Sequence, residues 1–207
     1  MKLNKRTLIF IIAIIICAIL KQALVSNLPI CANVPLGADD GLMINQAESI
    51  IKGTWLGAYN ETTFLKGPVF PLFLSLIYFL HIDYISAITI LYTISCLTLL
   101  WVIYKVIKNK KILFLIYIVL LFNPIMFGKE IMQRVYRNSL IPSFAFFIFA
   151  GYINLFLERN SEDIKKKIPT IVGLSIVLPL FWYTREDSMW IIPYIIFMSL
   201  SILISVI

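Results

Sequence analysis

Residues 37–71, GADDGLMINQAESIIKGTWLGAYNETTFLKGPVFP, form a long polar interruption between the first two apolar segments of the chain. The rest of the sequence is strongly hydrophobic, so that 60% of the 207 residues are hydrophobic and only 14% are charged. Soluble domains average about 25% charged residues, and this composition is typical of an integral membrane protein. The polar stretch is therefore where we expect the chain to leave the membrane and to carry charged side chains for chemistry.

Apolar runs of roughly 20 residues, the length needed to cross a bilayer as a helix, predict the membrane-spanning segments. They indicate an all-α, polytopic bundle of six or seven membrane helices. The candidate spans are 7–25, 84–104, 112–127, 140–157, 168–183 and 188–207. The segment 68–83 is also apolar, but it is short and contains Pro68 and Pro71. We expect it to be re-entrant or a short helix, and the alternative is a seventh crossing.

Lysine and arginine gather between alternate spans, which predicts the orientation of the chain. The basic segments 2–6, 105–111 and 159–167 are expected in the cytoplasm. The N-terminus is then cytoplasmic, and 26–67 becomes the first external loop. The formal charge of +7 thus reflects membrane topology and predicts no nucleic-acid partner. Low Gly and high Ile and Lys favour an AT-rich bacterial genome, so we expect a multi-pass protein of the bacterial cytoplasmic membrane.

Two short amphipathic helices are predicted on the external side, lying flat on the bilayer. In residues 40–52 the apolar side chains recur at helical spacing. A second helix is predicted over residues 129–138, where Glu130, Arg134 and Arg137 would share one face.

Three polar clusters are predicted on this external side. Their members are Asp39 and Asp40; Lys129, Glu130, Arg134 and Arg137; and Arg185, Glu186 and Asp187. The spanning segments carry almost no charge, whereas ion-coupled transporters keep ionisable groups at mid-membrane. Charges at one rim favour an enzyme at the membrane surface. The cysteines and the single histidine have no ligand spacing, so no metal ligand is assigned.

Each cluster has a structural interpretation beside the functional one. Asp39 and Asp40 are candidate general bases, or they cap the helix that follows. Arg134 and Arg137 are candidates for gripping a phosphate, or Arg134 forms a surface pair with Glu130.

The segment 185–187 follows an apolar run that ends with Trp182 and Tyr183. It either belongs to a site or is part of an interfacial aromatic belt whose charges pair with each other. Lys66 precedes Gly67 and Pro68 in the sequence. This lysine is either a loop anchor or a further phosphate contact.

The order of these features resembles the GT-C class of membrane glycosyltransferases, which use polyprenyl-phosphate sugars and include protein O-mannosyltransferases and lipid A aminoarabinose transferases. In that class an Asp or Glu of the first external loop is catalytic, and the loop runs into a His/Lys-Pro-Pro-Leu-like element. Asp39 and Asp40 match the first feature, and 66–71, KGPVFP, approximates the second. Residues 183–187, YTRED, are similar to a stretch of some bacterial members. Members are usually much longer, so residues 1–207 are expected to form one N-terminal transmembrane module.

The resemblance implies inverting transfer of a sugar on the outer face of the membrane to a glycan, lipid or protein acceptor. Asp40 or Asp39 would take the proton of the acceptor. It implies donor-phosphate contacts from Arg134, Arg137, Arg185 and Lys66, and sugar or acceptor contacts from Trp55, Tyr59, Glu186 and Asp187. Interfacial anchoring accounts for Trp55 and Tyr59 equally well. No cofactor is assigned, although a magnesium or manganese ion between the carboxylates would suit their hard oxygen ligands.

Two other functions stay open. One is a non-catalytic or truncated membrane subunit. The other is a transporter component for lipid-linked sugars or polysaccharide, which would need a polar path through the bundle. The uncharged interiors of the predicted spans count against such a path.

Overall fold

The computed structural model describes residues 4–32, 39–63, 65–185 and 187–205. Within these residues the chain is helical and has no strand, which confirms the predicted all-α class there. The longer helices are α1 (Lys5–Val25), α2 (Asp39–Ile51), α3 (Val69–Phe79), α4 (Tyr84–Val106), α5 (Lys110–Leu121), α6 (Ile141–Leu157), α7 (Ile164–Trp182) and α8 (Ile192–Ile204). Shorter helical turns are η1 (Pro124–Phe127), η2 (Lys129–Gln133), η3 (Arg137–Ser139) and η4 (Ser188–Ile191).

The helices differ in whether their length suits a membrane crossing. Those long and apolar enough are α1, α4 and the stretch Arg137–Leu157, which contains α6. In contrast, α5 has 12 residues, a length of about 18 Å, and a bilayer core is about 30 Å thick. Helix α7 has 19 residues but begins with the sequence IKKK. Among the described residues, length and composition thus support three of the predicted crossings.

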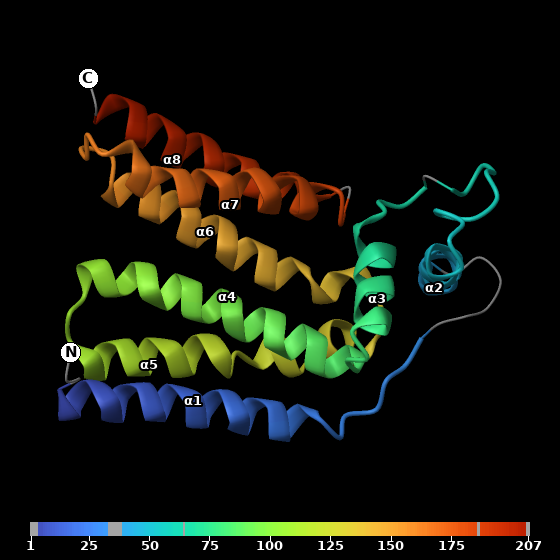
Figure 1. Cartoon of the computed structure of the whole chain (residues 1–207), viewed down its shortest axis with the longest axis horizontal. Coiled ribbons are helices and arrows are strands. Elements are labelled where there is room, and N and C mark those ends of the chain that lie inside the picture. Colours follow the sequence, from blue (N-terminus) through green and yellow to red (C-terminus); the bar gives the residue numbers. More distant parts are fainter. Residues whose placement is uncertain (1–3, 33–38, 64, 186, 206–207) are drawn as a thin grey trace.

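The bundle is built around contacts between α4 and α6. Helices α1, α4 and α5 pack on one another, and α7 and α8 pack on α6. Figure 1 shows these helices running in alternating directions, with α3 lying across one end of them. We call this end the α3 end. The opposite end holds the start of α1 and the α4–α5 and α6–α7 connections, and we call it the basic end.

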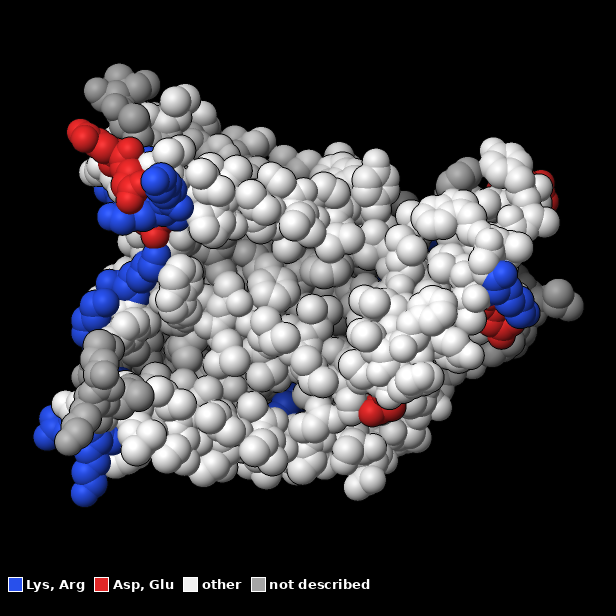
Figure 2. All heavy atoms as spheres, viewed as in Figure 1, with Lys and Arg blue, Asp and Glu red and all other residues white. Residues whose placement is uncertain are grey.

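The face of the bundle seen in Figure 2 is largely apolar between its two ends. In Figure 2 the charged side chains gather at both ends of the visible face, and the area between them is almost free of charge. Helix α1 exposes isoleucines along its length, with Ile9, Ile16 and Ile19 between 57% and 64% exposed. Soluble monomers rarely expose apolar patches of this extent. Such a surface is suited to lipid.

The helices near the α3 end partly follow the predicted pattern. A helix was expected over 40–52, and α2 occupies Asp39–Ile51 and packs against α3. Helix α3 has 11 residues, or about 16 Å, which makes 68–83 a short helix followed by a turn. The expected span 112–127 is interrupted, because α5 ends at Leu121. There Asn123 accepts a hydrogen bond from the Ile125 N–H at 3.0 Å, and Pro124 has no N–H for a continuing helix.

The prediction of one continuous helix over 129–138 is wrong. Only η2 and η3 are helical, and the backbone of Arg134 between them is extended. This backbone pairs with Cys31, whose N–H donates to the Gln133 carbonyl and whose carbonyl accepts from the Val135 N–H, both at 2.9 Å. A distant segment therefore supplies the hydrogen-bond partners that a helix would have found within itself.

Candidate functional site

The charged residues of α2 meet those of segment 129–139 at the α3 end. Asp39 and Asp40 form the first turn of α2, where the helix dipole stabilises a carboxylate. The facing segment is held by Tyr84 at the start of α4, whose hydroxyl donates to the Arg134 carbonyl oxygen at 2.7 Å. Residues 94 positions apart in the sequence are thereby brought into contact.

Asp40 and Arg134 form the most buried ion pair of this group. The Asp40 side chain is 0% exposed, and it accepts from Arg134 Nε at 2.9 Å and from Nη2 at 2.8 Å. The remaining nitrogen, Nη1, donates to Glu130 at 3.0 Å. The hydrogen bonds that Arg134 donates to Asp40 and Glu130 raise the pKa of Arg134 above its already high value. Both Asp40 oxygens are thus occupied by an arginine that stays charged.

Asp39 is more accessible, because its side chain is 33% exposed. Its Oδ2 lies 3.2 Å from Lys66 Nζ and accepts a hydrogen bond from the Tyr136 hydroxyl at 3.1 Å. Burial by itself would raise the pKa of Asp39, but Lys66 and Tyr136 outweigh it, and the pKa lies below its ordinary value. Both contacts are made to Oδ2, and among the described residues Oδ1 accepts no hydrogen bond.

Tyr136 joins the two arginines to Asp39. Its hydroxyl accepts from Arg137 Nε at 3.3 Å, and the Arg134 guanidinium lies 4.4 Å from the centre of its ring. Arg137 is only 4% exposed, so its guanidinium lies below the surface of the site, where it donates to the Tyr136 hydroxyl. Sequence reasoning did not single out Tyr136, and the one signal available was its position between Arg134 and Arg137.

Arg185 approaches the same end from the connection between α7 and η4. Its Nη1 donates to Asn138 Oδ1 at 2.7 Å, and its Nη2 pairs with Asp187. Its Nε is buried and has no hydrogen-bond partner in the described part of the chain. Glu186, predicted beside it, lies outside the described residues.

Gly67 places Lys66 next to the end of α7. A Cβ atom added at Gly67 would lie 1.8 Å from the carbonyl oxygen of Tyr183, a distance that no side chain tolerates. Only glycine therefore allows the two backbones to approach this closely. This contact brings the 66–68 element beside the segment that carries Arg185, although the two are far apart in the sequence.

The two aromatic residues of the predicted sugar contact lie on the loop after α2. Trp55 is 54% exposed and Tyr59 is 82% exposed. Such exposure suits anchoring in a membrane surface as well as stacking on a sugar, so the sugar contact stays a prediction.

An apolar cavity of about 390 Å³ lies between α3, α4, α6 and α7. Every described residue that lines it has an apolar side chain, and Val69, Leu140 and Leu180 are among them. Val69 follows Lys66 by three positions and Leu140 follows Arg137 by three, which places each pair of Cα atoms within about 11 Å. The cavity, called the apolar groove below, therefore begins near the backbone of Lys66 and Arg137.

No group of three or more His, Cys, Asp or Glu side chains able to hold a metal ion occurs among the described residues. The chain matches no protein-family model, no curated protein and no solved structure.

Proposed function

We propose that the chain is a membrane glycosyltransferase module of the GT-C type that takes its sugar from a polyprenyl-phosphate donor. It lies in the bacterial cytoplasmic membrane with the basic end in the cytoplasm and the α3 end outside. The helices of membrane-spanning length and the uncharged middle of the surface support its insertion. The basic connections at one end support this orientation through the positive-inside rule.

The observation that carries the proposal is the position of the apolar groove near Lys66, Arg137 and Arg185. A polyprenyl phosphate is an anionic head on a long apolar tail. The described lining of the groove is apolar. Lys66, Arg137 and Arg185 each lie within three to five positions, along the chain, of a lining residue: Val69, Leu140 and Leu180. A tail in the groove would hold the phosphate against the two more exposed cations, Lys66 and Arg185, whose side chains are 19% and 32% exposed.

Asp39 takes the role of general base, because both oxygens of Asp40 are bound by Arg134. The acceptor hydroxyl gives its proton to the Asp39 carboxylate, and the acceptor oxygen forms a bond to the anomeric carbon. The bond from that carbon to the phosphate oxygen breaks, and the polyprenyl phosphate leaves with the electron pair. Lys66 and Arg185 stabilise the charge of the leaving phosphate.

A second candidate is a non-catalytic subunit that binds the same lipid phosphate. The lowered pKa of Asp39 favours it, since an efficient general base has a pKa near the working pH. The two candidates share the binding site and differ only in whether Asp39 moves a proton.

Binding of prenyl phosphates of increasing chain length to the detergent-purified chain tests the shared site. We expect affinity to rise with tail length, because each buried methylene contributes about 0.8 kcal/mol. The double variant Lys66→Gln/Arg185→Gln should lose binding, whereas Lys52→Gln should keep it, since Lys52 pairs with Glu48 on the exposed face of α2. Affinity that ignores tail length, or equal losses in both variants, would show that the groove is not the donor site.

Replacing Asp39 with asparagine then separates the two candidates. If the chain is a glycosyltransferase, the wild-type chain releases prenyl phosphate from a prenyl-phosphate sugar, and Asp39→Asn loses this release but keeps donor binding. If release of prenyl phosphate is equally slow in the wild-type chain and in Asp39→Asn, with binding intact in both, the chain is the non-catalytic subunit.

A further inference from the structure

The basic end holds a second cavity that the proposed function does not use. It has a volume of about 930 Å³ and lies between the first turns of α1 and α5. One side is cationic and another is apolar. The lining residues are Asn4, Arg6, Lys108, Asn109, Lys110 and Lys111, together with Ile9, Phe10, Ala13 and Phe114.

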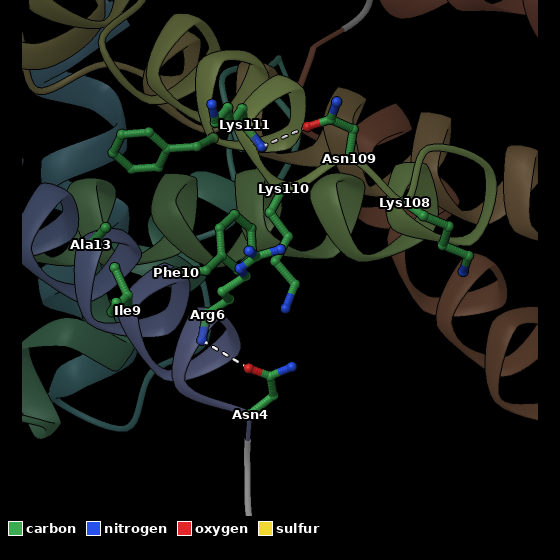
Figure 3. Close-up of a pocket in the computed structure, with 10 residues that line it drawn as sticks. Asn4, Arg6, Ile9, Phe10, Ala13, Lys108, Asn109, Lys110 and Lys111 are labelled. Atoms are coloured by element: carbon green, nitrogen blue, oxygen red, sulfur yellow. Dashed lines mark hydrogen bonds between the residues drawn. The ribbon is translucent and has the colours of Figure 1, made fainter.

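The charges in this cavity are not neutralised by its own walls, since the described lining contains no Asp or Glu. Figure 3 shows Arg6 from α1 and Lys110 from α5 reaching toward the same space beside the Phe10 ring. Lys110 is held there by a hydrogen bond from its ammonium to the Thr7 hydroxyl. Lys108 points away from this pair, and its ammonium lies 4.4 Å from the centre of the Tyr104 ring. Two like charges that share a partly apolar space repel each other unless an anion lies between them.

We propose that this cavity binds the headgroup of an anionic glycerophospholipid of the surrounding leaflet. The phosphate lies between Arg6 and Lys110, and both α1 and α5 begin here, so their positive dipole ends add to the attraction. The acyl chains continue along the apolar surfaces that leave the cavity. On α1, Ile9 is 58% exposed, and on α5, Leu115 is 62% exposed.

The apolar wall distinguishes a lipid from a free anion. A soluble phosphate would gain nothing from Phe10, Ala13 and Phe114, which line the cavity together with the cations. A lipid buries its glycerol and upper acyl chains against them. Only 11% of an 18-residue apolar stretch of α1 is buried by the rest of the described chain. A lipid bound between α1 and α5 would therefore add to the few contacts that hold α1 to the bundle.

Native mass spectrometry of the purified full chain in detergent tests this site. The probes are phosphatidylglycerol and phosphatidylcholine with identical acyl chains, and inorganic phosphate as a competitor. We expect retention of phosphatidylglycerol over phosphatidylcholine, with no displacement by millimolar phosphate. Equal retention of the two lipids would overturn the proposal. Displacement by phosphate would assign the cavity to a soluble anion and would overturn it as well.

Variants locate the site. Arg6→Gln/Lys110→Gln should weaken phosphatidylglycerol binding roughly 30-fold, from the loss of two cations near the headgroup. The control Lys165→Gln/Lys166→Gln removes the same charge from the exposed start of α7 and should change binding by less than about twofold. Arg6→Lys/Lys110→Arg keeps the charges and should keep the lipid, which guards against a folding defect. An equal loss in the control would mean that the total charge of the basic end, and not this cavity, holds the lipid.

Discussion

Replacing Arg134 with methionine is expected to destabilise the chain by about 3 kcal/mol, because it leaves the Asp40 carboxylate buried without its cation. Asp40 is 0% exposed and receives two charge-assisted hydrogen bonds of 2.8 and 2.9 Å from Arg134. Breaking a buried ion pair on one side costs about 3–5 kcal/mol. The Arg134 side chain is 28% exposed, so water screens part of the interaction, and we take the lower end of that range.

Thermal unfolding of the purified chain in detergent at neutral pH measures this loss. At about 2–4 °C per kcal/mol for a chain of this size, the midpoint should fall by about 6–12 °C. Glu130→Gln is the matched control, since it removes the other partner of the same arginine. Glu130 is 65% exposed, and an exposed pair contributes about 0–1 kcal/mol.

The double variant Asp40→Asn/Arg134→Met completes a thermodynamic cycle. With no charge left to bury, it should be more stable than the sum of the two single losses predicts, by about 2 kcal/mol. The reasoning is refuted if Arg134→Met unfolds at the same temperature as Glu130→Gln. It is also refuted if the two single losses simply add, because α2 would then be held to segment 129–139 by other contacts.

Two further predictions concern the approach of Lys66 to the end of α7. Gly67→Ala forces a Cβ against the Tyr183 carbonyl and should lower the free energy of unfolding by about 1–3 kcal/mol in the same assay. The control Gly173→Ala has nothing within 4 Å of its Cβ and should be neutral or stabilising. Equal effects of the two substitutions would contradict the close approach of Gly67 to Tyr183. The pKa of Asp39 is lower in the folded than in the unfolded chain, so its stabilising contribution is complete above the unfolded pKa of about 4 and is lost as the pH falls through the lower folded value. The stability gap between the wild-type chain and Lys66→Gln should therefore narrow when melts are repeated below pH 4, and a gap independent of pH would exclude Lys66 as the cause of that shift.

The helical class and the ends of several helices could be predicted from the sequence. Hydrophobic runs and caps are local, and a stretch of apolar residues has few ways to satisfy its backbone in lipid other than a helix. Asp83, for example, caps α4 by accepting from the Ser86 N–H at 2.9 Å, directly before a long apolar run. The charge-poor middle of the face seen in Figure 2 follows from the same runs, because apart from the buried Lys21 the charged residues lie where these runs end.

The candidate site could be predicted only in part. The sequence indicated that Asp39, Lys66 and the arginines share one end of the bundle, and the structure brings Asp39, Lys66, Arg134 and Arg137 into one network through Tyr136. Which carboxylate is accessible was not readable from the pattern, because Asp39 and Asp40 are adjacent and chemically identical. Their difference comes from the direction in which α2 presents each side chain to the facing segment.

By itself, the amino-acid sequence determined the apolar helices, the polar segment between the first two of them and the concentration of charge at the helix ends. Only the tertiary structure decided that the backbone at Arg134 is extended and pairs with Cys31, that both oxygens of Asp40 are bound by Arg134, and that Gly67 contacts Tyr183. A helix finds its hydrogen-bond partners within its own few residues, so its signal is local. The partner of an extended backbone or of a buried carboxylate is a distant segment, and only the packed chain brings that segment into contact.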